Sequence, residues 1–177
     1  MVNSSLFRRI ELQLLMNLTA HALGQKSQRI WTQTNAEALK AYADYTSSHL
    51  QTGASQALLE RMNSEAYKMG RLLRCLFLIR HEARAQRLIV ALYRNIGIKL
   101  SFDSSRQLCF QHCYFSRFYT PQACKAASAL DDGIIRGILG LTSEHLHFSQ
   151  RITEGCKQCR ARFLAMPSGK AKQIIDN

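Results

Sequence analysis

The chain has 177 residues, of which 46% are hydrophobic and 20% are charged, and its formal net charge is +12. This length suits one compact domain that buries about 70% of the surface exposed by its unfolded chain. No apolar run approaches the roughly 20 residues that cross a bilayer, and the first residues lack the basic and apolar regions of a signal peptide. We therefore expect a cytoplasmic protein with no membrane partner.

Four helices are predicted in the first half of the chain, where apolar residues recur at helical spacing between glycine and polar breaks. They cover about Leu6–Leu23, a segment from Asn35 as the cap to Gly53, about Ser55–Phe77 and about Glu82–Asn95. The first helix has an apolar face that we expect to be buried: Leu6, Phe7, Ile10, Leu14, Leu18 and Ala22. Cys75, inside the third helix among leucines, is also predicted to be buried.

The pattern changes after Gly97. Alternating residues predict strands over Ile98–Phe102 and Gln107–Phe115, a helix opens at Thr120-Pro121 and runs to Gly140, and a second hairpin follows over about Glu144–Ala165. This order predicts an α+β fold, with N-terminal helices packed on one face of a four-stranded antiparallel sheet (strand-strand-helix-strand-strand). We expect one domain over residues 1–167, helical over 5–96 and hairpin–helix–hairpin over 97–165, with a flexible tail over 168–177.

The cysteines are the most chemically suggestive residues. Cys156 and Cys159 form a Cys-x-x-Cys pair on a glycine turn, and such a pair can hold one metal ion or form one redox couple. On a regular strand, Cys109 and Cys113 point to the same face about 13 Å apart, too far for one ion. His112 is then expected on the opposite face. The best metal-ligand set is therefore Cys113, Cys124, Cys156 and Cys159, which would suit zinc or an iron–sulfur cluster. Ordinary reduced thiols in and near the core, and a redox or nucleophilic pair, are the alternatives to a metal.

Acid–base chemistry would fall to Asp131 or Asp132 in the helix that begins at Pro121, or to Glu154 beside the cysteine turn. Adjacent residues face about 100° apart on a helix, so the two cannot form a facing carboxylate pair, and we expect only one of them to point inward. An inward carboxylate near Arg136 or Arg151 would serve as a structural ion pair or as part of a site.

Much of the positive charge lies between Arg61 and Arg94. A basic helical surface of this kind is expected to be solvated, and a nucleic-acid partner is not favoured because no recognised nucleic-acid motif accompanies it. Nucleic-acid binding through this face is kept as a further alternative.

The segment from about Cys113 to Phe163 resembles the L-2-amino-thiazoline-4-carboxylic acid hydrolase-like family. The resemblance is carried by Cys113-Tyr114, by Cys124, by Leu130-Asp131 before a glycine-containing helix, and by the pattern Phe148-x-x-Arg151-x-x-x-Gly155 with a late cysteine. The layout is also similar to the 4-vinyl reductase type of small-molecule-binding domain. Ala127 stands where a second helical cysteine is common in the family, which leaves room for a binding or sensing role.

The resemblance implies a hydrolase-like protein that acts on a small anionic sulfur–nitrogen heterocycle at a cysteine-rich site. Its catalytic positions would be Cys124, Asp131 and Arg151. The alternative is a non-enzymatic sensor of a ligand, a metal or redox state. A homodimer is kept open, since the N-terminal helices could pair with a second subunit.

Overall fold

The structure, a computed structural model, describes residues 4–166, so the predicted tail at 168–177 lies outside the described residues. The elements occur along the chain in the predicted class and order. They are α1 Ser4–Leu23, α2 Asn35–Leu50, α3 Gln56–Leu76, α4 Glu82–Asn95, β1 Ile98–Phe102, β2 Leu108–Cys113, a 3₁₀ turn at Tyr114–Arg117, α5 Pro121–Leu139, β3 Glu144–Gln150, a 3₁₀ turn at Ile152–Glu154 and β4 Cys159–Ala165.

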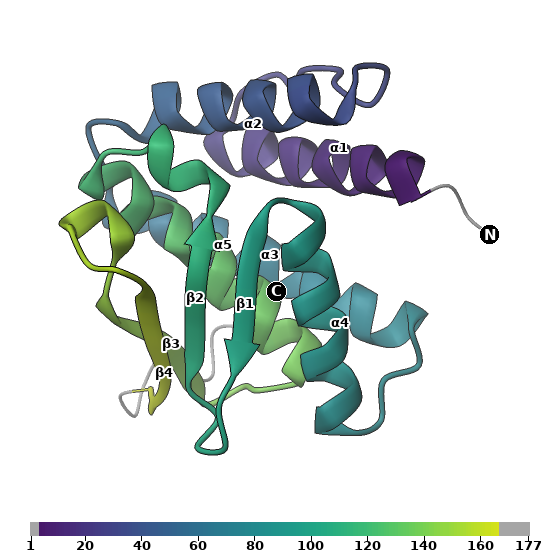
Figure 1. The fold of residues 1–177 in the computed structure, drawn as a ribbon, viewed down its shortest axis with the longest axis vertical. Helices are drawn as coiled ribbons and strands as arrows, with labels where there is room; N and C mark the ends of the chain where they lie inside the picture. Colours follow the sequence, from purple (N-terminus) through teal and green to yellow (C-terminus); the bar gives the residue numbers. More distant parts are fainter. Residues whose placement is uncertain (1–3, 167–177) are drawn as a thin grey trace.

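The four strands form one antiparallel sheet in the order β1-β2-β4-β3. Each hairpin pairs its own strands, and β2 joins β4 at the centre. Leu100, Leu108, Phe110 and Ala161 are buried, whereas their neighbours Lys99 and Arg160 are exposed. One face of the sheet therefore packs on the helices, as predicted: α5 and α3 lie behind it, and α1 and α2 lie across one end (Figure 1).

Helices α3 and α5 pack so closely that their backbones touch through glycine. A Cβ atom on Gly133 would lie 2.6 Å from the Cβ of Ala66, and one on Gly137 would lie 2.8 Å from the backbone nitrogen of Arg71. Real Cβ atoms do not approach so closely, so these positions require glycine. The close pair makes α5 the centre of the fold, with other elements on several of its sides.

A buried ion pair ties α5 to its surroundings. Arg136, only 1% exposed, donates from Nε to Oδ1 of Asp132 at 2.8 Å and from Nη2 to the Asn63 side chain on α3 at 2.7 Å. The same Oδ1 accepts the backbone N–H of Leu146 on β3 at 2.7 Å. Asp132 thus links α5 to α3 and to β3. Its charge is tolerated inside the protein because the guanidinium of Arg136 and these hydrogen bonds match it.

Several predicted boundaries were wrong by a few residues. The cap of α2 is Thr34 rather than Asn35, because Thr34 and Glu37 form a reciprocal capping box. Strand β2 ends at Cys113, where the chain turns into a 3₁₀ helix instead of continuing to Phe115. Strand β3 ends at Gln150 for the same reason, since a 3₁₀ turn follows it.

Two burial predictions were also wrong. On α1 the expected core positions Leu6, Phe7, Ile10 and Leu14 are exposed, and Leu12 and Met16 are buried instead. Cys75 near the end of α3 is exposed too. Both errors have one cause: α1 is apolar around most of its circumference and α3 ends in a leucine-rich turn, so spacing alone does not identify the side that meets the core.

Among residues 4–166, no helix is long and apolar enough to cross a bilayer.

Candidate functional site

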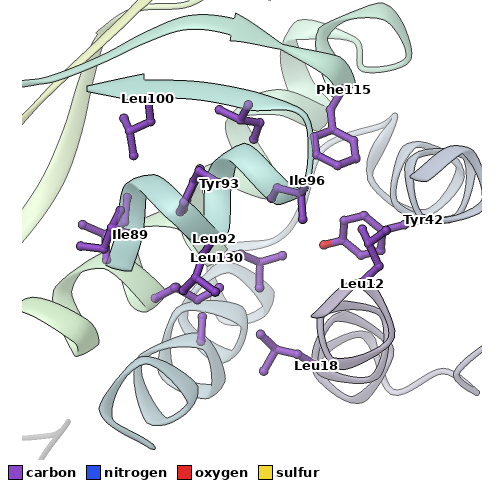
Figure 2. Packing of buried hydrophobic residues seen from close by; sticks show 14 of the residues in the cluster. Leu12, Leu18, Tyr42, Ile89, Leu92, Tyr93, Ile96, Leu100, Phe115 and Leu130 are labelled. Atoms are coloured by element: carbon purple, nitrogen blue, oxygen red, sulfur yellow. The ribbon is translucent and has the colours of Figure 1, made fainter. Parts of the chain in front are cut away.

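A cavity of about 330 Å³ lies between the N-terminal helices and the hairpin–helix–hairpin part of the fold. Its wall comes from α1, α2, the end of α3, α4, α5 and the start and end of the first hairpin, and most of the side chains are leucine, isoleucine, phenylalanine and methionine. Figure 2 shows Leu92 and Ile96 on one side of this region and Leu18 and Tyr42 on the other. A cavity of this size and apolar character is typical of small-molecule sites.

Two carboxyl groups interrupt the apolar wall, Asp131 on α5 and Glu11 on α1. Oδ1 of Asp131 accepts a 2.7 Å hydrogen bond from the hydroxyl of Tyr93, and Oε2 of Glu11 accepts one of 3.0 Å from Asn95. Burial raises the pKa of Asp131 to about 6 and that of Glu11 to about 7, because the apolar surroundings disfavour the charged form. Each carboxyl therefore changes its protonation state close to neutral pH.

Both adjacent aspartates lie inside the protein, contrary to the expectation that only one would. Asp131 faces the cavity and bonds to α4, whereas Asp132 faces α3 and β3. The reason is that α5 is enclosed on several sides, so two directions about 100° apart both meet other elements. As expected from that angle, the two side chains do not form a facing pair.

Three cysteine thiols lie around Asp131. Cys113 and Cys124 line the cavity, and Cys159 is buried on β4, where its Sγ accepts the backbone N–H of Ile152 at 3.3 Å. Burial raises the pKa of Cys113 to about 12 and that of Cys159 to about 11, and it raises the pKa of Cys124 as well. Cys124 is near enough to both other sulfurs to raise their pKa further by charge repulsion. All three groups are therefore thiols, not thiolates, at neutral pH.

Arg151 is buried beside this cluster. Its Nη2 donates to Oγ of Ser128 at 3.1 Å, and its guanidinium lies 4.6 Å from the centre of the Phe148 ring. Its positive charge lowers the pKa of both Asp131 and Cys124, although burial outweighs this effect. Arg151 is not one of the residues that line the cavity, so within residues 4–166 the ionisable groups on the wall are acids, phenols and thiols.

The structure brings most of the predicted site residues into one neighbourhood. Cys113, Cys124 and Asp131 share the cavity wall, with Cys159 and Arg151 behind it. Cys156 lies in the turn between β3 and β4, where its backbone N–H donates to the carbonyl oxygen of Arg151 at 3.2 Å.

A metal centre finds no support in this arrangement. In the part of the chain that the structure describes, no three histidine, cysteine, aspartate or glutamate side chains are grouped so that they could hold a metal ion. The proposed set of Cys113, Cys124, Cys156 and Cys159 therefore does not form a four-sulfur site in this conformation.

A β-bulge changes one prediction on the first hairpin. Lys99 pairs with His112, but the next residue, Leu100, pairs with Phe110, so Gln111 is the extra residue. The bulge turns Cys113 toward the cavity while Cys109, beside the buried Leu108 and Phe110, falls on the other side of the sheet. The two cysteines therefore do not share a face, and His112 lies opposite Cys113 as predicted.

Glu11 is the site residue that the sequence analysis missed. It stands four residues after Phe7 and seven before Leu18, within the apolar residues of α1. The sequence did offer a signal for Glu11, namely an acidic residue among the apolar residues of one helix. Such a residue indicates either a buried polar contact or a cavity, because an unpaired buried charge is costly.

Comparison of the chain with models of protein families, with curated proteins and with solved structures yields no match. The resemblance to the hydrolase-like family thus stays a prediction.

Proposed function

We propose that the chain is a small-molecule-binding domain whose ligand is largely apolar and occupies the cavity between α1, α4 and α5. The observation that carries this proposal is the cavity itself, about 330 Å³ and lined by apolar side chains, with only a few polar groups on its wall. Small-molecule sites are usually pockets of this size, with a mostly apolar wall and a few placed polar groups.

The polar groups on the wall limit the chemistry of the ligand. The hydroxyls of Tyr42, Tyr93 and Tyr119 are already paired with Thr19, Asp131 and Thr46, and the thiols of Cys113 and Cys124 are only weak hydrogen-bonding groups. The carboxyls of Asp131 and Glu11 each use one oxygen in a hydrogen bond to Tyr93 or Asn95, so their second oxygens are the strongest groups for a ligand. Carboxyl groups favour a ligand that donates a hydrogen bond, such as an alcohol, a phenol or an amide. They disfavour a small anion, so we propose this class in place of the anionic heterocycle expected from the resemblance.

The uncharged fluorophore N-phenyl-1-naphthylamine tests the proposal, because it is apolar and brightens when it leaves water. We expect saturable binding of one molecule, with competition by phenols and medium-chain alcohols. The variant Ala127→Phe, which fills part of the cavity, should weaken binding about tenfold or more. Ala83→Phe, at an exposed position of α4, is the matched control and should bind as the parent does.

A failure of the folded parent protein to bind any uncharged probe, or equal binding by Ala127→Phe, would contradict the proposal.

Hydrolysis remains a second candidate, favoured by one observation: Cys124 and Asp131 line the same cavity, and the positive charge of Arg151 acts on both. In this reading Asp131, with a pKa of about 6, would accept the proton of the Cys124 thiol as the sulfur attacks. Cys124→Ser should then abolish the turnover of small cyclic carboxylates and leave probe binding intact. Unchanged turnover would remove Cys124 from the mechanism.

A further inference from the structure

The large exposed apolar side chains gather at the mouth of the cavity. Within residues 4–166 all of them except Trp31 lie on two segments, which we call the apolar rim: Leu6, Phe7, Ile10 and Leu14 on α1, and Leu72, Leu76, Phe77 and Leu78 at the end of α3. Phe7 and Ile10 on one segment and Leu76 and Phe77 on the other also line the cavity. The two segments therefore flank one opening, and a gathering of exposed apolar side chains of this kind marks an interaction site.

The conformation of Leu78 points to the same conclusion. Its side chain is 70% exposed, and its backbone has a φ of +49°, in the left-handed region where glycine or asparagine is normally found. In the isolated chain a leucine at this position is therefore unfavourable for two reasons. Its backbone is strained, and its apolar side chain is exposed to water. Its presence is explained if the side chain leaves water against a partner.

The charge around the apolar rim identifies the partner. Arg80 and Arg84 follow Leu78 along the chain; both are exposed, and neither takes part in an ion pair within the described residues. The acidic residue of this stretch, Glu82, is paired with Arg106 at 2.7 Å. The segment that leaves the apolar rim at Leu78 therefore carries two arginines that no ion pair among the described residues neutralises.

Two occupants fit an exposed apolar surface of this kind, a second copy of the chain or a lipid surface. A second copy would bring two sets of arginines together on chains that each carry +12, and this repulsion opposes association. An anionic bilayer offers acyl chains to the leucines and phosphate groups to the arginines at the same time.

We propose that the apolar rim and its arginines dock on an anionic lipid surface, with the cavity mouth against the membrane. Such docking needs no helix that spans the bilayer. It departs from the expectation, drawn from the sequence, that no membrane takes part. The docking does not depend on the identity of the cavity ligand.

Flotation of the full chain with vesicles tests the proposal. We expect binding to vesicles of phosphatidylcholine mixed with phosphatidylglycerol, weak binding to phosphatidylcholine alone, and a steep loss of binding as salt is added. Leu78→Asn should weaken vesicle binding about tenfold or more without unfolding the protein, because asparagine tolerates the left-handed backbone. Leu76→Gln should act in the same direction, and Arg80→Gln with Arg84→Gln should reduce the salt dependence.

Trp31→Gln is the matched control, since Trp31 is 46% exposed and lies outside the apolar rim. Equal binding by Trp31→Gln and the parent, with loss in Leu78→Asn, supports docking through the rim. Absence of binding to anionic vesicles at low salt, or binding that Leu78→Asn leaves unchanged, would overturn the proposal. So would a stable dimer in sedimentation equilibrium that Leu78→Asn dissociates, because the rim would then face a second copy. Binding of N-phenyl-1-naphthylamine is measured in parallel on Leu78→Asn. Because Leu78 does not line the cavity, unchanged probe binding shows that a loss of vesicle binding comes from the rim and not from a damaged cavity.

Discussion

Tyr93 on α4 donates a 2.7 Å hydrogen bond to Oδ1 of Asp131 on α5, and both residues line the cavity. The bond lowers the pKa of Asp131 and partly offsets the effect of burial, while the negative charge of Asp131 helps to raise the pKa of Tyr93 well above its usual value. This contact thus joins the helical half of the fold to the hairpin–helix–hairpin half, and it helps to set the pKa of the carboxyl group on the cavity wall.

The first prediction concerns this hydrogen bond. Tyr93→Phe should lower the free energy of unfolding by about 1.5–3 kcal/mol at pH 8, where Asp131 is ionised, and by less at pH 5, where it is largely protonated. Urea denaturation at the two pH values measures the difference. Tyr42→Phe, which removes a hydroxyl paired with Thr19 and not with a carboxylate, should cost about 1 kcal/mol at both. Equal losses in the two variants at both pH values would show that the Tyr93 bond is not specific to the ionised carboxylate.

The second prediction concerns Glu11 and pH. Its pKa is raised from 4.5 to about 7 by burial, so the folded protein binds a proton that the unfolded chain releases. This contribution to stability is fully present below about pH 4.5 and is lost as the pH rises through about 7. Between pH 5 and 8 the parent should lose about 2–3 kcal/mol of unfolding free energy from this group.

Glu11→Gln should remove most of this dependence, as measured by denaturation at intermediate pH values. Glu82→Gln, at an exposed position, is the control and should keep it. A parent protein whose stability is flat or rises between pH 5 and 8 would contradict the assignment.

The third prediction concerns the contact between α3 and α5. Gly133→Ala would place a Cβ 2.6 Å from Ala66, so the helices must separate, and the cost should exceed about 3 kcal/mol. Gly53→Ala has open space around its Cβ and carries only the cost of its φ of +89°, about 1 kcal/mol. Thermal unfolding of the two variants gives the comparison, and similar losses would show that the helices adjust easily.

The fourth prediction concerns thiol reactivity. At pH 8 an alkylating reagent should modify the exposed Cys75 first, because burial raises the pKa of Cys113, Cys124 and Cys159 and keeps them protonated. Peptide mass spectrometry over time gives the order. A cavity ligand should slow the modification of Cys113 and Cys124 further and leave Cys75 unchanged. Rapid modification of Cys124 in the folded protein would indicate a stabilised thiolate and would favour the hydrolytic candidate.

The fold class and element order were predictable because capping residues and glycine stops are local signals. Thr120-Pro121 and Gly140, for example, bound α5 as expected, with Thr120 accepting the backbone N–H of Ala123 and Gly140 in the left-handed conformation. The central pairing of β2 with β4 was not predictable, since it depends on how the two hairpins meet rather than on either one alone.

The candidate site was predictable only in part. Cys113, Cys124 and Asp131 were chosen for their chemistry, and they do share a wall. Their cavity could not be foreseen, because a cavity has no sequence pattern and α1 turns its expected core face toward the opening. The β-bulge at Gln111, which separates Cys109 from Cys113, has no glycine or proline to announce it.

Methyl NMR of the protein with N-phenyl-1-naphthylamine tests the cavity proposal most directly. The account predicts shifts at Leu92, Leu130 and Ile134, which line the cavity, and none at Leu50 and Leu108, which are buried elsewhere. Shifts confined to Leu72 and Leu78, which are exposed and do not line the cavity, or spread equally over all five buried residues, would contradict it.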